Sequence, residues 1–587
     1  MTNDTSSTAV VGNPEPQIDD PQSLYEPHPE TGSTPLMTRR QINLVVVGLM
    51  FGMFLSALDQ TVVGTSMRTI ADDLNGLDQQ AWVTTAYLIT ATIMTPIYGK
   101  LSDIFGRRPL FLIAITLFLL GSLLAGFSQS MYMLATFRAV QGLGAGGLMA
   151  LPLAIMGDML APRERARYQG YFLAVFGIAS VFGPLVGGLL SGTHEILWVA
   201  GWRWVFLVNL PVGIVALAAV VRFLHLPKFE DKKKVRIDFL GAAFVVVALV
   251  PLLIVAEQGR SWGWGSAGSW FCYALGAFGI VAFIITEARM KDDAIIPLKL
   301  FRSTVFSMAT VIGVMVGFAM FGAMMVIPLY LQLVQGATPT ESGLLMLPMI
   351  LGLMIASIVS GQIISRTGKY RLFPTVGTAM LVLGFTWMTF ETLDKPLWFV
   401  MVGMFFIGLG LGQLMQTLTI ASQNSVSGKD MGVATSASTF FRQIGGTLGT
   451  AVLFSVLFTR IPDTIQAAFN NPTLKNNLVA ATQDPSVLQN PANTKILELL
   501  HSNDMSAFGD ALNGNSAFLT GADSRLSAPF LTGFIDASIT VFWVALVVAA
   551  VAFVLSLFFR PAPLRKISAM QERANEDRAE AALAALG

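Results

Sequence analysis

Charge and cysteine are both scarce in this chain of 587 residues. Only 12% of the residues are Asp, Glu, Lys or Arg, and the formal net charge of +1 gives no basic surplus for binding nucleic acid. The single cysteine, Cys272, excludes an internal disulfide and a cysteine-based metal site. The sequence also has no Walker A loop, no cluster of metal ligands and no nucleophile–base motif. An enzyme and an ATP-driven pump are therefore disfavoured, and we expect neither a cofactor nor a metal.

Apolar residues, in contrast, make up 53% of the chain, and its mean hydropathy is +0.63. This composition is that of an integral membrane protein. Runs of about 20 apolar residues predict an all-α membrane protein with fourteen transmembrane helices. The predicted spans are 42–63, 80–99, 110–128, 132–152, 169–190, 202–223, 237–257, 269–288, 304–326, 342–363, 373–391, 397–418, 434–458 and 533–558.

Lys and Arg are distributed unevenly between the short loops. Alternate loops hold 19 of them, whereas the opposite short loops hold only Arg68, Arg260 and Lys395. Because basic loops stay in the cytoplasm, both termini are expected there, in the cytoplasmic membrane of a bacterium. Residues 1–40 are rich in Ser, Thr, Pro and acid and predict a disordered cytoplasmic tail. Residues 561–587 form a second cytoplasmic tail.

The chain contains an internal repeat. Residues 99–108 close the second predicted helix, and residues 361–369 close the tenth with glycines at the same spacing of seven followed by a base. The glycines alone would be explained by a tight turn. The matched spacing favours two related six-helix halves, 41–225 and 303–560, separated by two inserted helices at 237–290. Such halves predict a substrate cavity between them and alternating access by rocking.

Asp59 lies near the end of the first apolar run. A carboxylate at membrane depth costs free energy unless it is paired or has a function, so Asp59 is a candidate functional site. The predicted span places it about four residues, roughly 6 Å, from the outer end of its helix.

Five segments resemble the fourteen-helix drug:proton antiporter branch of the major facilitator superfamily. They are residues 58–63, 99–108, 134–144, 177–188 and 201–206, which lie in the family's order along the chain. The resemblance spans nearly all of 40–560. It implies a major facilitator fold, no cofactor other than the proton gradient, and an arginine linked to proton transfer at Arg138.

Asp59 and Arg138 are therefore expected to form the proton-coupling site. Both are predicted at similar depth, and a nearby Arg favours the ionised carboxyl whereas apolar burial disfavours it. That balance can change with conformation. A static ion pair between two helices and a solvated Asp59 in an outer vestibule are the alternatives.

Two further motifs are candidates for conformational control. Asp103, Arg107 or Arg108, and Asp158 can form a charge cluster that holds one access state, or they are ordinary solvated loop charges. In the fifth helix, small residues near one stripe permit close packing and Pro184 permits a bend. The residues of the latch are Gly99, Asp103, Gly106, Arg107, Arg108 and Asp158, and those of the helix motif are Gly177, Gly183, Pro184, Gly187 and Gly188.

Candidate residues for the substrate cavity are polar or adaptable side chains within or near predicted spans: Gln141, Met320, Met324, Gln332, Gln416 and Arg442. The methionines suit varied ligands but are equally typical of core or lipid-facing positions. Arg442 suits an anionic group or a helix end. Since the family's dication exporters tend to have acids in the second half and this chain has few, we expect neutral or monocationic lipophilic substrates.

The sequence thus predicts a proton-coupled exporter of lipophilic drugs or toxic compounds. An exporter of lipids or lipid conjugates is the alternative, and a receptor or scaffold is a third hypothesis. Protons, membrane lipids and a small lipophilic substrate are the expected partners. The outer loop at 459–532 contains amphipathic pieces at 461–469 and 496–512 that would cap the vestibule or bind an outer partner, unless the loop is an irregular insertion.

Overall fold

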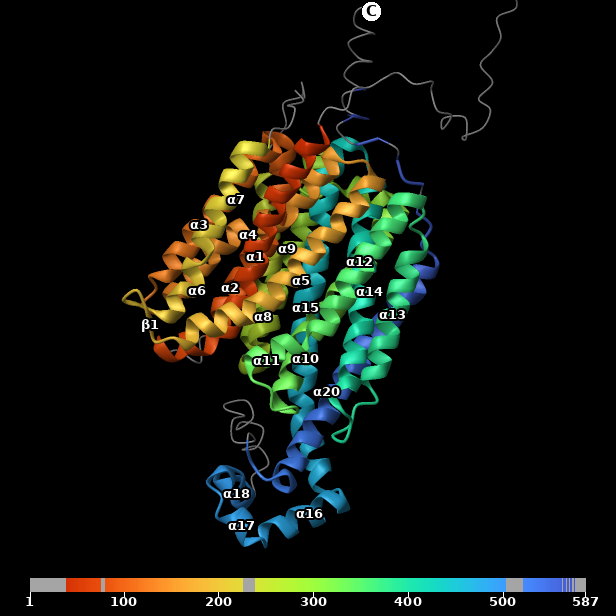
Figure 1. Cartoon of the computed structure of the whole chain (residues 1–587). Coiled ribbons are helices and arrows are strands. Elements are labelled where there is room, and N and C mark those ends of the chain that lie inside the picture. The colour runs from red at the N-terminus through yellow and green to blue at the C-terminus, as the bar shows by residue number, and fades with distance from the viewer. Residues whose placement is uncertain are drawn as a thin grey trace, which may run out of the picture.

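The computed structural model describes residues 38–74, 80–224, 238–502 and 521–561, together with 563–565, 567–568, 571–572 and 575. It is an elongated bundle of long helices (Figure 1). The long helices are α1 (Arg39–Asp73), α2 (Gln80–Phe105), α3 (Arg107–Gly126), α4 (Met131–Met159), α5 (Pro162–Gly192), α7 (Asn209–Phe223), α8 (Phe239–Trp262), α9 (Ala267–Met290), α10 (Thr304–Leu333), α12 (Leu347–Thr367), α13 (Leu372–Met388), α14 (Leu397–Asn424), α15 (Met431–Phe469) and α20 (Ser524–Leu557). The predicted tail at 1–37 and most of 561–587 lie outside the described residues.

Short elements connect these helices. They are the hairpin β1 (Glu195–Ile196) and β2 (Val199–Ala200), the helices α6 (Trp204–Leu207), α11 (Pro339–Leu345), α16 (Pro472–Thr482), α17 (Pro485–Leu488) and α18 (Thr494–Ser502), and the 3-10 turns η3 (Gly201–Arg203), η4 (Lys291–Asp293), η5 (Leu298–Arg302), η6 (Gly428–Asp430) and η7 (Pro491–Asn493). In Figure 1 the lobe formed by α16–α18 lies at one end of the bundle. We call this the lobe end, and the end where α1 begins and α20 finishes the terminal end.

Within the described residues, twelve helices are long and apolar enough to cross a membrane. Two of the fourteen predicted spans, α2 and α13, are not among them. α13 has only 17 residues, and α2 contains five threonines between residues 84 and 95. Both still pack inside the bundle, α2 against α4 and α13 against α14. The predicted count of fourteen is therefore not confirmed.

The long helices pack in two groups that are coloured red to yellow and green to blue in Figure 1. In the first group α4 packs against α2 and α3, and α1 packs against α5 and α7. In the second, α15 packs against α10 and α20, and α14 packs against α12 and α13. The groups meet along α5 and α12 and along α2 and α15, while α8 and α9 pair with each other beside α2 and α15. Apolar burial within and between these groups holds the bundle together.

Several predicted helix ends are wrong. α1 continues to Asp73 instead of ending at 63, so Asp59 lies well inside the helix and not four residues from its end. The sixth predicted span breaks at Val208, between α6 and α7, because Pro211 has no N–H to bond to the carbonyl four residues earlier. Asn209 is the first residue of α7 and is fully buried, which matters for the site described below.

The predicted outer loop is also shorter than expected. Residues 461–469 continue α15 rather than forming a separate surface helix, and α20 begins at Ser524. Of the predicted piece at 496–512, only the part within α18 is described. Arg525 ties the lobe to α20 through ion pairs with Asp484 and Asp523, each 3.0 Å long.

Glu391 is a buried acid at the lobe end, in the loop between α13 and α14. Its side chain is 1% exposed, and Oε1 accepts a 3.0 Å hydrogen bond from the Tyr330 hydroxyl. Burial raises the pKa of Glu391 to about 7. Because this value exceeds the unfolded value of about 4.3, the folded protein binds more protons than the unfolded chain between these values.

The stability of the protein should therefore fall as pH rises from about 4.5 to 7, in part through Glu391. Glu391→Gln should remove this contribution and leave the variant more stable than the parent above pH 7. Melting temperatures of the purified protein between pH 5 and 8 would measure the difference. Asp394→Asn, which changes an exposed acid in the same loop, is the control. Identical pH profiles for the parent and Glu391→Gln would contradict the expectation.

Candidate functional site

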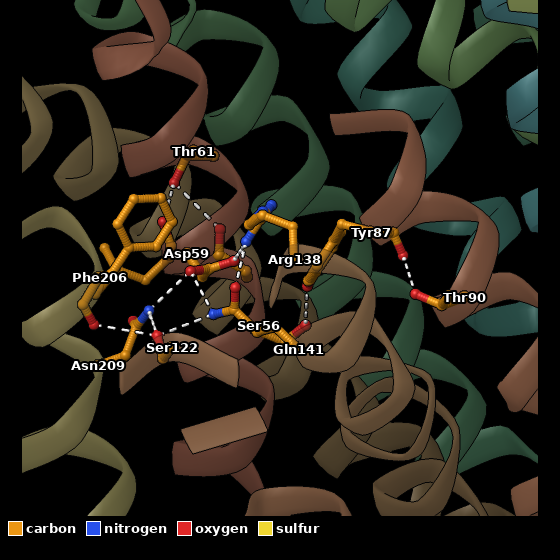
Figure 2. Close-up of polar contacts among 12 residues, drawn as sticks. Ser56, Asp59, Thr61, Tyr87, Thr90, Ser122, Arg138, Gln141, Phe206 and Asn209 are labelled. Carbon is orange, nitrogen blue, oxygen red and sulfur yellow. Dashed lines mark hydrogen bonds and ion pairs between the residues drawn. The ribbon is translucent and has the colours of Figure 1, made fainter. Parts of the chain in front are cut away.

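Asp59 of α1 lies at the centre of a fully buried polar network (Figure 2). Its Oδ2 accepts a hydrogen bond from Arg138 Nη1 at 2.5 Å, and this contact is also an ion pair. Its Oδ1 accepts from Gln141 Nε2 at 2.8 Å and from Asn209 Nδ2 at 2.7 Å. Both carboxyl oxygens thus accept from N–H donors, which is the geometry that an ionised carboxylate requires.

Four helices supply this network. Arg138 and Gln141 are three residues apart on α4, so they lie on one helix face, and Arg138 Nη1 also donates to Gln141 Oε1 at 2.7 Å. Ser122 of α3 accepts from both amides and donates to the Phe206 carbonyl. Gly121 permits the close approach of α3, because a Cβ atom there would collide with the backbone of Gln141.

Arg138 also contacts a residue of α2, Tyr87. The guanidinium carbon lies 4.0 Å from the ring centroid of Tyr87, whose hydroxyl is 3.2 Å from Ser56 Oγ. A cation over an aromatic face is stabilised electrostatically, more so when water is absent. Arg138 is therefore held by a carboxylate, an amide and a ring, and its side chain is only 2% exposed.

Contact between Asp59 and Arg138 agrees with the sequence prediction that they lie at similar depth. The alternative in which Asp59 is solvated in an outer vestibule is wrong, since the residue has no exposed surface. The geometry fits both remaining alternatives, a static ion pair and a proton-coupling site. Sequence reasoning did not find Ser122 and Asn209, and it assigned Gln141 to the substrate cavity. Gln141 instead belongs to this network.

A cavity of about 470 Å³ lies between the two helix groups. α1, α2, α4 and α5 form one wall, α10, α14 and α15 form the other, and Leu253 and Ala256 of α8 also line the cavity. The cavity has the size of a drug-sized ligand site, and most of its lining is apolar. Asp59 is not among the described lining residues, but its neighbour Gln60 is.

Three of the predicted cavity residues line this space: Met320, Gln416 and Arg442. Met324 lines a small separate hollow beside it. Gln332 is half-buried near the end of α10, and neither it nor Gln141 is among the described lining residues. The predictions for Gln141 and Gln332 are therefore not supported by the structure. The Gln141 side chain is bonded to Asp59, Arg138 and Ser122, and Gln332 lies about three turns beyond the lining residue Phe321, near the end of α10.

The two helix groups are joined at the terminal end by the predicted charge cluster. Arg107 forms ion pairs with Asp103 at 2.5 Å and with Asp158 at 2.7 Å. Asp103 Oδ2 also accepts from the backbone N–H of Val433 at the start of α15, so the cluster reaches the second group. The alternative of ordinary solvated charges is wrong, since Arg107 is buried.

The glycines of this motif have distinct roles. Gly99 packs directly against Ser436 of α15, and a larger residue would separate the helices. Gly106 has φ of 93°, a conformation that favours glycine, and turns the chain between α2 and α3. Arg108 does not join the cluster; it is half-buried and donates to the Val221 carbonyl instead.

A second link at the terminal end was not predicted. Arg165 of α5 is fully buried and donates to Gln423 Oε1 of α14 at 2.5 Å, and also to the carbonyls of Gly157 and Leu160. Nearby, Gln416 donates to the Ala166 carbonyl at 2.5 Å. The sequence shows Arg163, Arg165 and Arg167 as equivalent basic loop residues, and only the helix phase separates the buried one from its exposed neighbours.

The motif of the fifth helix forms two faces and not one stripe. Gly183 and Gly187 lie against Thr61 and Thr65 of α1. Gly177, Pro184 and Gly188 face the second helix group: Gly177 lies against Ile350 of α12, Pro184 against Gly343 of α11, and Gly188 against Thr340 of α11. α5 is thus packed closely on both sides, as expected of a helix on which one group moves against the other.

Comparisons with known proteins give a consistent result. The model of the Major Facilitator Superfamily matches residues 49–450. The chain is 35% identical to the Multidrug transporter protein MdtP of Bacillus subtilis, over 92% of this chain and 96% of that protein. It is 31% identical to Multidrug resistance protein 3 of the same organism, over 90% and 98%. The solved proton:xylose symporter XylE has a TM-score of 0.53 and 13% identity, covering 91% of this chain and 99% of that one.

The buried pair predicts a strong coupling between two substitutions. Asp59→Leu leaves Arg138 buried without its carboxylate, and Arg138→Met leaves Asp59 without its cation, so each should cost about 3–5 kcal/mol. The double variant removes both charges, so its loss of unfolding free energy should be clearly smaller than the sum of the two single losses. Thermal unfolding of the purified variants in detergent measures all three. Additive losses would show that the ion pair contributes nothing specific to stability.

Proposed function

Because the chain belongs to the major facilitator superfamily, we propose that it exports lipophilic compounds in exchange for protons. Membership in this family makes the protein a multi-pass membrane transporter and not an enzyme. It also confirms the predicted fold class, while the count of fourteen spans is not confirmed, since twelve helices within the described residues meet the length and composition of a span. The names of the relatives, a multidrug transporter and a multidrug resistance protein, support drugs or toxic compounds as substrates.

The observation that carries the proton-coupling proposal is the buried network around Asp59. Its carboxylate is the only acidic group in the network, and it connects α1 to α4 and α7. Protonation of Asp59 would remove the negative charge that Arg138 and the two amides hold in place. The contact between α1 and α4 would then weaken, so proton binding changes how these helices pack.

The same two helices form part of the cavity wall. On α1, Gln60 lines the cavity beside Asp59, and on α4 Ala145 lies one turn after Gln141. A change in helix packing at Asp59 would therefore move the cavity wall that contacts the substrate, without direct contact between proton and substrate. This arrangement supports an exchange of protons for substrate in which the protonation state of Asp59 sets the position of the wall formed by α1 and α4.

The terminal end is closed in this conformation by Arg107 and Arg165 and their partners. The lining residues of α15 continue from Thr439 to Phe454, away from that end. With the terminal end in the cytoplasm, as the basic loops predict, the cavity faces outward. The two arginine clusters then hold the outward-facing state, and breaking them opens the inward-facing state.

Asp59→Asn should abolish proton coupling, because the amide cannot take up and release a proton. In proteoliposomes with a pH gradient, we expect the gradient-driven transport of dyes to fall at least about 10-fold, across anionic, neutral and cationic dyes. Proton release from the parent during transport is the second measurement. Asp536→Asn, which changes an exposed acid on α20, is the matched control. Undiminished, gradient-dependent transport by Asp59→Asn would overturn the coupling proposal.

Arg165→Ala should open the terminal end, because it removes the bond between α5 and α14. Thr419 lines the cavity, so a single cysteine at Thr419→Cys in a Cys272→Ser background reports access. We expect several-fold faster labelling by a membrane-impermeant maleimide applied from the cytoplasmic side in inside-out vesicles. Arg167→Ala removes an exposed arginine two residues away and is the control. Equal labelling in both variants would show that Arg165 does not hold this end closed.

A further inference from the structure

Arg442 of α15 is the only charged residue among the described residues that line the cavity. No acidic residue appears among them. The other polar groups are amides and hydroxyls, such as Gln169, Gln443 and Thr439. The electrostatic character of the binding space is therefore positive, and it comes from one guanidinium.

Arg442 also differs from the other buried arginines in the part of the chain that the structure describes. Arg107 and Arg138 form ion pairs with aspartates, and Arg165 donates to two carbonyls and an amide. Arg442 is 8% exposed and has neither a carboxylate nor a hydrogen-bond acceptor among the described residues. A desolvated guanidinium without a counter-charge is costly, so an anion that entered the cavity would remove an existing penalty.

Gln169 of α5 is a second unpartnered group on the opposite wall. Its side chain is 3% exposed and lines the cavity, yet neither its carbonyl oxygen nor its amide nitrogen has a hydrogen-bond partner among the described residues. Most buried amides are satisfied. In contrast, Gln416 in the same cavity already has partners on two other helices: its side chain accepts a hydrogen bond from Ser357 of α12 and donates one to the Ala166 carbonyl of α5. Both polar atoms of Gln169 are covered by neighbouring atoms, but they have no partner among the described residues to lose, so the side chain is free to turn toward a ligand in the cavity.

The remaining wall is apolar. It includes Met53, Met149, Phe172, Phe176, Met320 and Phe454, which come from both helix groups. A small inorganic anion would pair with Arg442 but leave this surface unfilled. An amphiphile would satisfy both parts of the site, because its apolar body gains from burial and its head group gains from the charge.

We propose that the cavity binds amphiphilic monoanions, with a carboxylate or similar head group on Arg442, a further hydrogen bond to Gln169, and the apolar body among the Met and Phe side chains. This inference rests on the proposed transport function and assigns its substrate class. It departs from the sequence-based expectation of neutral or monocationic compounds. That expectation weighed the scarcity of acids but not the lone cation facing the cavity.

Three probes with one aromatic body test the proposal: pyrenebutyrate, its methyl ester and pyrenebutylamine. Their binding to the full-length protein in phosphatidylcholine nanodiscs is measured by fluorescence anisotropy. The parent should bind the carboxylate most tightly. Arg442→Gln should weaken carboxylate binding about 10- to 100-fold, the range expected for charge-assisted hydrogen bonds, and leave ester binding within about twofold. Arg442→Lys should restore most of the preference, and Gln169→Leu should weaken carboxylate binding by several-fold.

Arg222→Gln is the control, because it removes the same charge from an exposed position on α7 outside the cavity. Unchanged binding of the ester shows that each variant is folded. Competition by phosphatidylglycerol in the nanodiscs would assign the anion to a lipid head group, and its absence would assign it to a free amphiphile. The proposal is overturned if the amine binds the parent as tightly as the carboxylate, or if Arg442→Gln weakens all three probes equally.

The outcome of the probe-binding test does not depend on whether transport is coupled to protons. Binding in nanodiscs involves no pH gradient, whereas Asp59→Asn affects only gradient-driven transport. A protein that prefers anions but does not couple to protons would therefore fail the test of the proposed function and pass this one. A coupled exporter that prefers cations would give the reverse result.

Discussion

The structure depends on balancing the negative charge of one carboxylate, that of Asp59, inside an apolar bundle of helices. Asp59 has no contact with solvent, so its charge must be balanced by side chains that reach it from other helices. Arg138, Gln141 and Asn209 supply this balance: the first two lie on one face of α4, and Asn209 begins α7. Gly121 brings α3 close enough for Ser122 to accept from both amides.

The acid of the buried network and the charged residue of the cavity lie in different helix groups, which suits the proposed exchange of protons for substrate. The acid lies in the first helix group, outside the cavity, and the unpaired cation lies in the second group and faces the cavity. In the proposed mechanism, proton and substrate therefore need not compete for one residue. They would act on opposite walls of one space, and the wall formed by α1 and α4 would respond to both.

Much of this arrangement could be predicted from the sequence, because a charge at membrane depth is visible in a linear pattern. Asp59 and Arg138 were both recognised, and their pairing followed from their similar depth. The cluster of Asp103, Arg107 and Asp158 was also recognised, and only Arg108 was assigned wrongly. Gln141 and Gln332 were misassigned because a linear pattern reveals neither the partners of a side chain nor how far along a helix the cavity extends. Arg165 was missed because a buried arginine at a helix start is indistinguishable in sequence from its exposed neighbours.

The sequence by itself determined the class of protein, the approximate positions of the helices and the family, since these follow from composition, hydropathy and motif order. Only the tertiary structure decided which polar groups meet. Helix phase and helix packing bring Gln141 and Asn209 to Asp59, and the packing of α15 makes Arg442 the one charged residue among the described residues that line the cavity. A partner for a buried charge is chosen in three dimensions, so no linear pattern could show that Asp59 is fully compensated and Arg442 is not.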